Sequence, residues 1–143
     1  ARHAVEEGLV QVKNMVQIGI RGPLAASADL DFIKKHKIKV FTVDDIRRQN
    51  IFDFVKTLPQ FNGPTYISFD VDCLDPAYAP GTGTPVPGGL TTYETQQILR
   101  ALKIKNLVGA DIVEVSPPYD TSQITGLAAV DTLFELMCLA ANK

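Results

Sequence analysis

Apolar runs alternate with helix-like stretches along the whole chain of 143 residues. The short apolar runs, rich in β-branched and aromatic residues, indicate strands, whereas the longer stretches between them place apolar residues at helical spacing. The strands are expected at residues 15–20, 39–43, 65–70 and 107–115. The helices are expected at residues 28–36, 91–103 and 122–141, with an interrupted helical segment at residues 46–58.

Capping and turn residues support these boundaries. Ser27 is a plausible N-cap for the first helix, and Asp44 and Asp45 suit the positive end of the next one. Residues 74–89 form a long turn-rich stretch. No repeat, linker or low-complexity tract interrupts the pattern, so the chain is expected to form part of one domain.

The alternation of strands and helices predicts the fold class. Strands joined by helical crossovers form a parallel sheet with helices on both faces, so we expect a three-layer α/β/α fold with a mainly parallel sheet. In such sheets ligands bind beyond the carboxyl ends of the strands, and candidate chemistry is therefore sought there.

Charge and cysteine content narrow the function classes. A net charge of -2 gives no electrostatic case for binding nucleic acid or an anionic membrane. We expect no apolar run to approach the roughly 20 residues that span a bilayer. Cys73 and Cys138 are too few for a disulfide framework and are expected to be buried thiols in a reducing compartment.

Two carboxylates follow the third predicted strand. Asp70 and Asp72 are two residues apart, and side chains at that spacing on a strand point to the same side. The pair would repel unless a cation lay between them, and carboxylate oxygens suit hard divalent ions such as manganese or magnesium. The alternative is a pair of aspartates that cap a helix or form a turn.

The surrounding sequence carries a family resemblance. Residues 68–90 read SFDVDCLDPAYAPGTGTPVPGGL, which closely resembles the central motif of the arginase and agmatinase (ureohydrolase) family. Similarity extends to VQIGIRG at residues 16–22, DIVEVSPPYD at 111–120 and GLAA at 126–129. The loop PGTGTP and the following GGLTTY look more like agmatinases than arginases. The resemblance implies that residues 1–143 are the C-terminal part of a single ureohydrolase domain, a partial arginase-like fold whose N-terminal part is absent.

The resemblance also implies residue roles. Asp70 resembles the aspartate that bridges two manganese ions, and Asp72 resembles the aspartate that binds one of them. Glu114 resembles the catalytic glutamate that holds the guanidinium of the substrate, and Thr84 resembles a threonine that contacts it. The implied reaction is attack on the guanidinium carbon by water activated between the two ions, which yields urea and an amine. Asp75 is expected to have a structural role in the turn.

Other polar residues are interpreted more simply. Asp111 and Asp120 are expected to be structural, through capping or loop hydrogen bonds. His36 lies in a basic Lys-Lys-His-Lys segment and His3 does not match the proton-shuttle histidine of the family. We therefore assign neither histidine to a metal or to proton transfer.

The function expected from the resemblance is manganese-dependent hydrolysis of a guanidino compound, most simply agmatine to putrescine and urea. The histidine-containing metal motifs of the family do not occur in this sequence, so these residues alone are expected to be inactive, with an unpaired sheet edge and exposed apolar surface. The alternative is a non-catalytic, truncated homologue with a structural or regulatory role. Guanidinobutyrate and guanidinopropionate are alternative substrates. The resemblance further implies a homo-oligomer, with a cytoplasmic location expected and a mitochondrial one possible.

Overall fold

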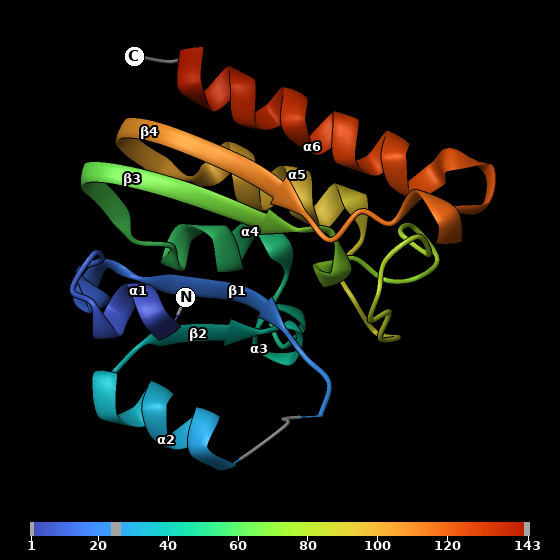
Figure 1. The fold of residues 1–143 in the computed structure, drawn as a ribbon. Helices are drawn as coiled ribbons and strands as arrows, with labels where there is room; N and C mark the ends of the chain where they lie inside the picture. The colour runs from blue at the N-terminus through green and yellow to red at the C-terminus, as the bar shows by residue number, and fades with distance from the viewer. Residues whose placement is uncertain (1, 24–26, 142–143) are drawn as a thin grey trace.

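The computed structural model describes residues 2–23 and 27–141 (Figure 1). The strands are β1 (Val16–Ile20), β2 (Lys39–Thr42), β3 (Gln60–Asp70) and β4 (Lys103–Val113). The α-helices are α1 (Arg2–Glu6), α2 (Ser27–His36), α3 (Val43–Arg47), α4 (Ile51–Phe54), α5 (Thr92–Ala101) and α6 (Ile124–Ala141). The short 3-10 turns are η1 (Val12–Asn14), η2 (Val55–Thr57), η3 (Val71–Cys73), η4 (Pro117–Tyr119) and η5 (Thr121–Gln123).

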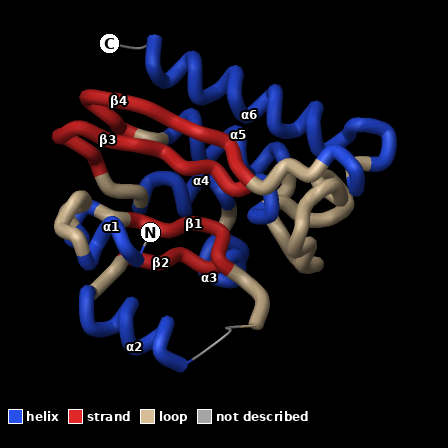
Figure 2. Tube along the Cα trace, in the orientation of Figure 1, coloured by secondary structure: helices blue, strands red, loops and turns tan. Residues whose placement is uncertain are grey.

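The strands form two parallel pairs. β1 pairs with β2 and β3 pairs with β4, and in the second pair Asp70 lies opposite Val113. All four strand arrows point the same way in Figure 1, so their carboxyl ends lie at one side of the molecule. The loops gather there (Figure 2), which is where a parallel α/β fold positions its functional groups.

The long strands differ from their expected bounds. β3 begins at Gln60 and β4 at Lys103, several residues before the predicted starts at 65 and 107. The pairing of β3 with β4 extends each strand, and it passes Gly63 and Pro64 through a register shift rather than ending there. The helix expected at 91–103 accordingly ends at Ala101. Backbone pairing between distant segments therefore overrides the local turn signal.

Capping residues decide the helix starts. Thr42 accepts a hydrogen bond from the Asp45 N–H and its own backbone donates to the Asp45 carboxylate, so α3 starts at Val43, which was expected to end the second strand. Thr91 and Glu94 form the same reciprocal arrangement at the start of α5. A capping box satisfies two backbone N–H groups that the first turn leaves without helical partners.

The core lies between the strands and helices α3, α4 and α5. Ile46, Phe54, Val71 and Leu74 are almost fully buried, and the Phe41 and Phe54 rings meet edge to face with centroids 5.2 Å apart. Burying such side chains contributes roughly 1.5–3 kcal/mol each. This packing fixes the end of β3, where the candidate site begins.

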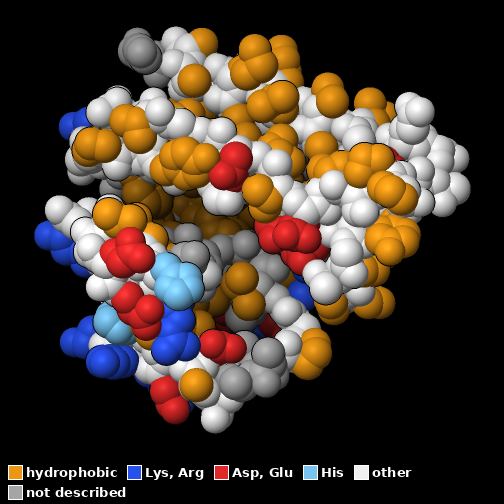
Figure 3. Space-filling view, viewed as in Figure 1, with side chains coloured by type: hydrophobic (Ala, Val, Ile, Leu, Met, Phe, Trp, Pro, Cys, Tyr) orange, Lys and Arg blue, Asp and Glu red, His pale blue; other side chains and the backbone are white. Residues whose placement is uncertain are grey.

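One side of the molecule exposes apolar surface. Tyr66 on β3 is 59% exposed and Val108 on β4 is 60% exposed. Figure 3 shows hydrophobic side chains over α6 and a hollow with hydrophobic walls between the two strand pairs. The outward residues of α6 are Ile124, Leu127, Val130, Leu133, Phe134 and Met137. The expected exposed apolar surface is therefore present among the described residues.

The expectation that no apolar run approaches the length of a membrane span is wrong for the α6 region. Residues Thr121–Ala141 would be long and apolar enough to cross a membrane, with 28% of the stretch buried. Its buried face, however, holds polar groups that pair with α5: Asp131 accepts from Gln96 and Glu135 accepts from Arg100. The packing thus accounts for α6 as a helix of the α/β fold.

The ion pair between α5 and α6 gives a test of this packing. Arg100 donates to both carboxylate oxygens of Glu135, whose side chain is 8% exposed. We expect Arg100→Met to lower the free energy of unfolding, because the Glu135 carboxylate stays buried without its partner. Urea denaturation of the protein that the native gene encodes measures this change. Arg48→Met, at an exposed arginine, is the control, and equal effects of the two substitutions would contradict the prediction.

Candidate active site at the carboxyl end of β3

The two aspartates are brought together by a turn. Asp70 is the last residue of β3, and its carboxylate accepts a hydrogen bond from the Asp72 N–H at 3.0 Å, which caps η3. Asp70 and Asp72 were expected to point to the same side because side chains alternate along a strand. That reason is wrong, because β3 ends at Asp70 and a turn follows it. Asp70 thus caps η3 and also lies beside Asp72 as one of two neighbouring carboxylates.

Thr84 and Glu114 reach the same place from other segments. Residues 80–89 (PGTGTPVPGG) form a glycine-rich loop. Within it, the Thr84 hydroxyl donates to Asp72 Oδ2 at 3.0 Å. Glu114 directly follows β4, and its Oε2 lies 3.8 Å from where a Cβ on Gly83 would stand. The fold thus gathers all four expected site residues at the carboxyl end of the β3–β4 pair.

The Glu114 backbone is unusual. Its φ is 65°, in the left-handed region that side-chain-bearing residues seldom adopt. Such a conformation costs of order 1–3 kcal/mol and persists only when surrounding contacts hold it. No local sequence signal indicates this turn, so the direction of the Glu114 side chain could not be inferred from the sequence.

The carboxylates perturb one another. Burial raises the pKa of Asp70 to about 6, and the neighbouring charges of Asp72 and Glu114 add to the rise, while the hydrogen bond from the Asp72 N–H opposes it. Three acidic groups in one small region therefore repel one another when ionised. A bound cation would relieve this repulsion.

The raised pKa of Asp70 predicts a pH effect on the metal-free protein. Between an ordinary aspartate value near 3.8 and about 6, the native state binds more protons than the unfolded state. Stability is therefore expected to fall as the pH rises through this window. Thermal unfolding with a chelator present measures this slope, and Asp70→Asn should flatten it because asparagine does not titrate. The same slope in both proteins would contradict the prediction.

A cavity adjoins Asp72 and Thr84. Its volume is about 410 Å³, and its other walls are formed by Arg21, Gly22, Pro23, Pro85 and Val86. The Arg21 guanidinium donates to the carbonyl oxygens of Leu74 and Val86, at 3.1 Å and 2.6 Å. Arg21 therefore anchors the glycine-rich loop to the end of β1. The sequence interpretation did not single it out, although it directly precedes the Gly-Pro turn.

Asp75 has the structural role expected for it. Its carboxylate accepts from the N–H groups of Ala77, Gly88 and Gly89 at 2.7–3.1 Å. These hydrogen bonds hold the pKa of Asp75 below its ordinary value. Gly89 must be glycine, since an added Cβ would stand 2.4 Å from the Asp75 nitrogen. The Asp75 carboxylate thus ties the two ends of the loop together through backbone hydrogen bonds.

The two remaining acidic candidates have structural contacts. Asp120 accepts from the N–H groups of Thr125 and Gly126 and so caps α6, as expected. Asp111 accepts from the Tyr66 hydroxyl at 2.8 Å, while its Oδ1 is buried without a partner among the described residues. Neither contact involves the Asp70–Asp72 pair.

The cysteines are less buried than expected. Cys73 and Cys138 are free thiols in half-buried positions. Burial nevertheless raises the pKa of the Cys73 thiol to about 12, and the charges of Asp70 and Asp72 contribute to the rise. The raised pKa favours the protonated thiol of Cys73 at neutral pH.

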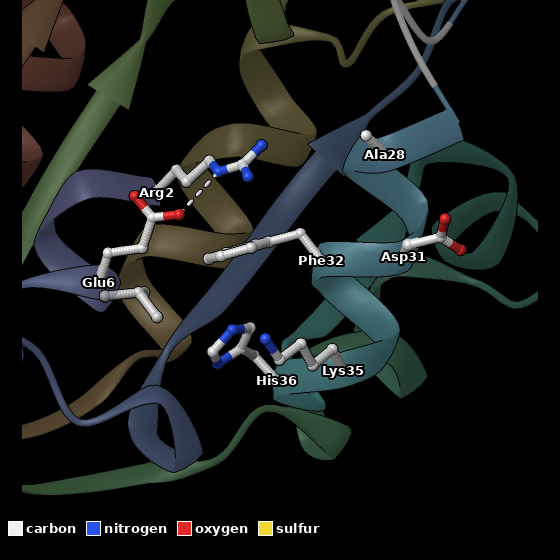
Figure 4. Close-up of a pocket in the computed structure, with 8 residues that line it drawn as sticks. Arg2, Glu6, Ala28, Asp31, Phe32, Lys35 and His36 are labelled. Atoms are coloured by element: carbon white, nitrogen blue, oxygen red, sulfur yellow. Dashed lines mark hydrogen bonds and ion pairs between the residues drawn. The ribbon is translucent and has the colours of Figure 1, made fainter.

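A second cleft lies away from the carboxylates. Figure 4 shows it between α1 and α2, with a volume of about 500 Å³. Within it Arg2 donates to Glu6 at 3.0 Å and His36 lies against Phe32 with ring centroids 4.4 Å apart. The His3 side chain is 92% exposed. The contacts are those of a solvated helix surface, which agrees with leaving both histidines out of the site.

The donor set at β3 suits a hard divalent cation only in part. Asp70 and Asp72 supply carboxylate oxygens, and their mutual repulsion favours a cation beside them. Within residues 2–23 and 27–141, however, no group of three or more His, Cys, Asp and Glu side chains is close enough to hold a metal ion. The described residues therefore supply two candidate ligands and no complete metal site. Together, the parallel strands and the acidic cluster at their carboxyl ends define an α/β protein with a candidate site at the edge of its sheet.

Comparison with known proteins identifies the family. The model of the Arginase family matches residues 1–139. The chain is 46% identical to a guanidinopropionase of Pseudomonas aeruginosa, over 99% of this chain and 45% of that protein. It is 45% identical to an agmatinase of Proteus mirabilis, over 99% of this chain and 44% of that protein. Proclavaminate amidino hydrolase from Streptomyces clavuligerus superposes with a TM-score of 0.85 at 39% identity, over 98% of this chain and 47% of that one.

The chain belongs to the arginase family. The expected recognition of a ureohydrolase-like sequence and of the three-layer α/β/α fold class is confirmed. The chain spans less than half the length of the curated relatives it matches.

Proposed function

We propose that the protein containing this chain is a manganese-dependent ureohydrolase that releases urea from a guanidino compound. The observation that carries the proposal is the gathering of Asp70, Asp72, Thr84 and Glu114 at the carboxyl end of the β3–β4 pair, in a chain that belongs to the arginase family. Its similarity to a guanidinopropionase and to an agmatinase supports this reaction class.

Asp70 and Asp72 are the residues proposed to hold manganese. Their oxygens match the preference of hard cations. Burial is the main cause of the raised pKa of Asp70, and the charges of Asp72 and Glu114 add to it; a cation would neutralise those charges. Bound manganese would lower the pKa of water and make hydroxide available at neutral pH. Two carboxylates are too few to complete such a site, so further ligands are proposed to come from residues outside this chain.

Glu114 and Thr84 are proposed to position the substrate. A carboxylate can accept paired hydrogen bonds from the planar guanidinium cation, and the position of Glu114 beside Gly83 directs it to the glycine-rich loop. The Thr84 hydroxyl, which donates to Asp72, orients that carboxylate and has lone pairs left for a substrate N–H. Together these residues would hold the guanidinium carbon next to the acidic pair.

Agmatine is the proposed substrate, and guanidino acids are the principal alternative. The glycine-rich loop resembles agmatinases, yet identity to a guanidinopropionase and to an agmatinase is nearly equal, at 46% and 45%. The substrate must therefore be decided by assay.

The test is urea release from the protein that the native gene encodes, with and without manganese. Agmatine, guanidinobutyrate, guanidinopropionate and arginine are compared at equal concentration. Manganese-dependent urea that is fastest with agmatine supports the full proposal, and faster release from a guanidino acid changes the substrate only. A folded, manganese-loaded protein that releases no urea from any of them would favour the non-catalytic homologue.

A further inference from the structure

The loop that carries Thr84 is tied to α6 by a single buried glycine. The Gly81 N–H donates to the Thr125 hydroxyl at 2.8 Å, and the Gly81 carbonyl accepts from the Ser116 N–H at 2.8 Å. Thr125 is fully buried at the start of α6, and Ser116 is two residues beyond Glu114. Gly81 therefore joins three segments: the glycine-rich loop, the loop after β4 and the first turn of α6.

Asp120 holds the other side of this junction. Its two carboxylate oxygens accept from the N–H groups of Thr125 and Gly126, at 2.9 Å and 2.8 Å. Its side chain also packs directly on Gly81, because a Cβ added there would stand 2.5 Å from the Asp120 Cβ. Asp120 thus fixes the start of α6, and with it the Thr125 hydroxyl, against the glycine-rich loop.

The junction lies next to strained backbone. Glu114 has φ 65°, and Ser122 and Gln123 have φ values of 61° and 59°. These left-handed residues flank the segment that contains Ser116 and Asp120. Because left-handed backbone persists only where surrounding contacts hold it, the hydrogen bonds at Gly81 and at the α6 start are suited to keep Glu114 in this conformation.

We propose that Asp120 and Thr125 are positioning residues that set the distance between Glu114 and the Asp72–Thr84 pair; this inference rests on the proposed function. Neither Asp120 nor Thr125 forms a hydrogen bond with Asp70 or Asp72. They act through Gly81, whose backbone links the loop of Thr84 to the loop of Glu114. Losing either contact leaves the acidic groups in place and frees Glu114 to move relative to them.

Thr125→Val and Thr125→Ser form the matched pair that tests the proposal. Valine keeps the volume and removes the acceptor for the Gly81 N–H, whereas serine keeps the hydroxyl. In the manganese-loaded protein of the native gene, Thr125→Val is expected to lower kcat/KM about 10- to 100-fold, mainly through a higher KM, with unchanged manganese content. Thr125→Ser should stay within about threefold of the wild type. Asp120→Ala, which removes the cap from α6, is expected to follow Thr125→Val.

Guanidine hydrochloride binding, measured by calorimetry on the same proteins, separates this inference from the proposed function. If the wild type releases no urea, the proposed function fails, while weaker guanidine binding by Thr125→Val than by Thr125→Ser still supports the positioning role. Equal KM values and equal guanidine affinities in the wild type and Thr125→Val would overturn it, even with a lower melting temperature. A wild type that binds no guanidine would overturn it as well.

Discussion

Asp70→Asn is expected to remove almost all manganese-dependent urea release from the protein that the native gene encodes. Asparagine keeps the size of the side chain and one oxygen acceptor, but it removes a charge from the acidic group that is proposed to hold the metal. Changing a residue that merely supports a metal ligand costs about 10- to 100-fold in affinity or activity, so losing a ligand itself should cost more than about 100-fold. Manganese content, measured by atomic spectroscopy, should fall together with activity.

Asp31→Asn is the matched control for this prediction. Asp31 is an exposed aspartate on α2, away from the β3 carboxylates, so the same change of charge should leave activity and manganese content unaltered. An Asp70→Asn protein that keeps both its manganese and its activity would contradict the proposed metal site. Loss of activity with full manganese content would instead assign Asp70 a role in the reaction other than holding the metal.

Glu114→Gln is expected to weaken substrate binding and to leave the metal in place. Glutamine keeps the length of the side chain, whereas the charge that is proposed to face the guanidinium is lost. A hydrogen bond to a charged group contributes about 1.5–3 kcal/mol, so kcat/KM should fall about 10- to 100-fold. Because the contact is made to the bound substrate as well as in the transition state, most of this change should appear in KM.

Two readings distinguish this result from damage to the fold. Glu7→Gln changes an exposed glutamate that is far from Glu114 in the sequence, and it should keep the wild-type KM. Manganese content of Glu114→Gln should match the wild type, in contrast to Asp70→Asn. An unchanged KM would show that Glu114 does not hold the guanidinium, and a lower manganese content would place it at the metal instead.

Much of the candidate site could be predicted because it is local in sequence. Asp70, Asp72 and Thr84 lie within one motif, and the turn that gathers them is specified by its own aspartates and glycines. Glu114 was predicted from the resemblance of its segment to the family, and the pairing of β3 with β4 brings it to the same edge. The reason given for the convergence of Asp70 and Asp72 was wrong, because a capped turn aligns them rather than strand alternation.

The structure decided what depends on distant contacts. The Gly81 N–H meets the Thr125 hydroxyl across 44 residues, and Arg21 reaches the Val86 carbonyl across 65. No local pattern encodes either contact. The left-handed backbone of Glu114 is likewise not indicated by any turn residue at that position. Strand lengths also followed pairing rather than local composition, as Gly63 and Pro64 within β3 show.

The sequence by itself determined the family, the α/β class, the order of the elements and the acidic residues at the end of the third strand. Hydrophobic spacing, caps and turn residues act over a few positions, so they can be recognised along the chain. Only the tertiary structure decided the direction of the Glu114 side chain and where β3 and β4 begin. It also decided that Gly81 hydrogen-bonds to both Ser116 and Thr125. Those features arise from hydrogen bonds and packing between segments far apart in the chain, and their energies depend on the folded arrangement as a whole.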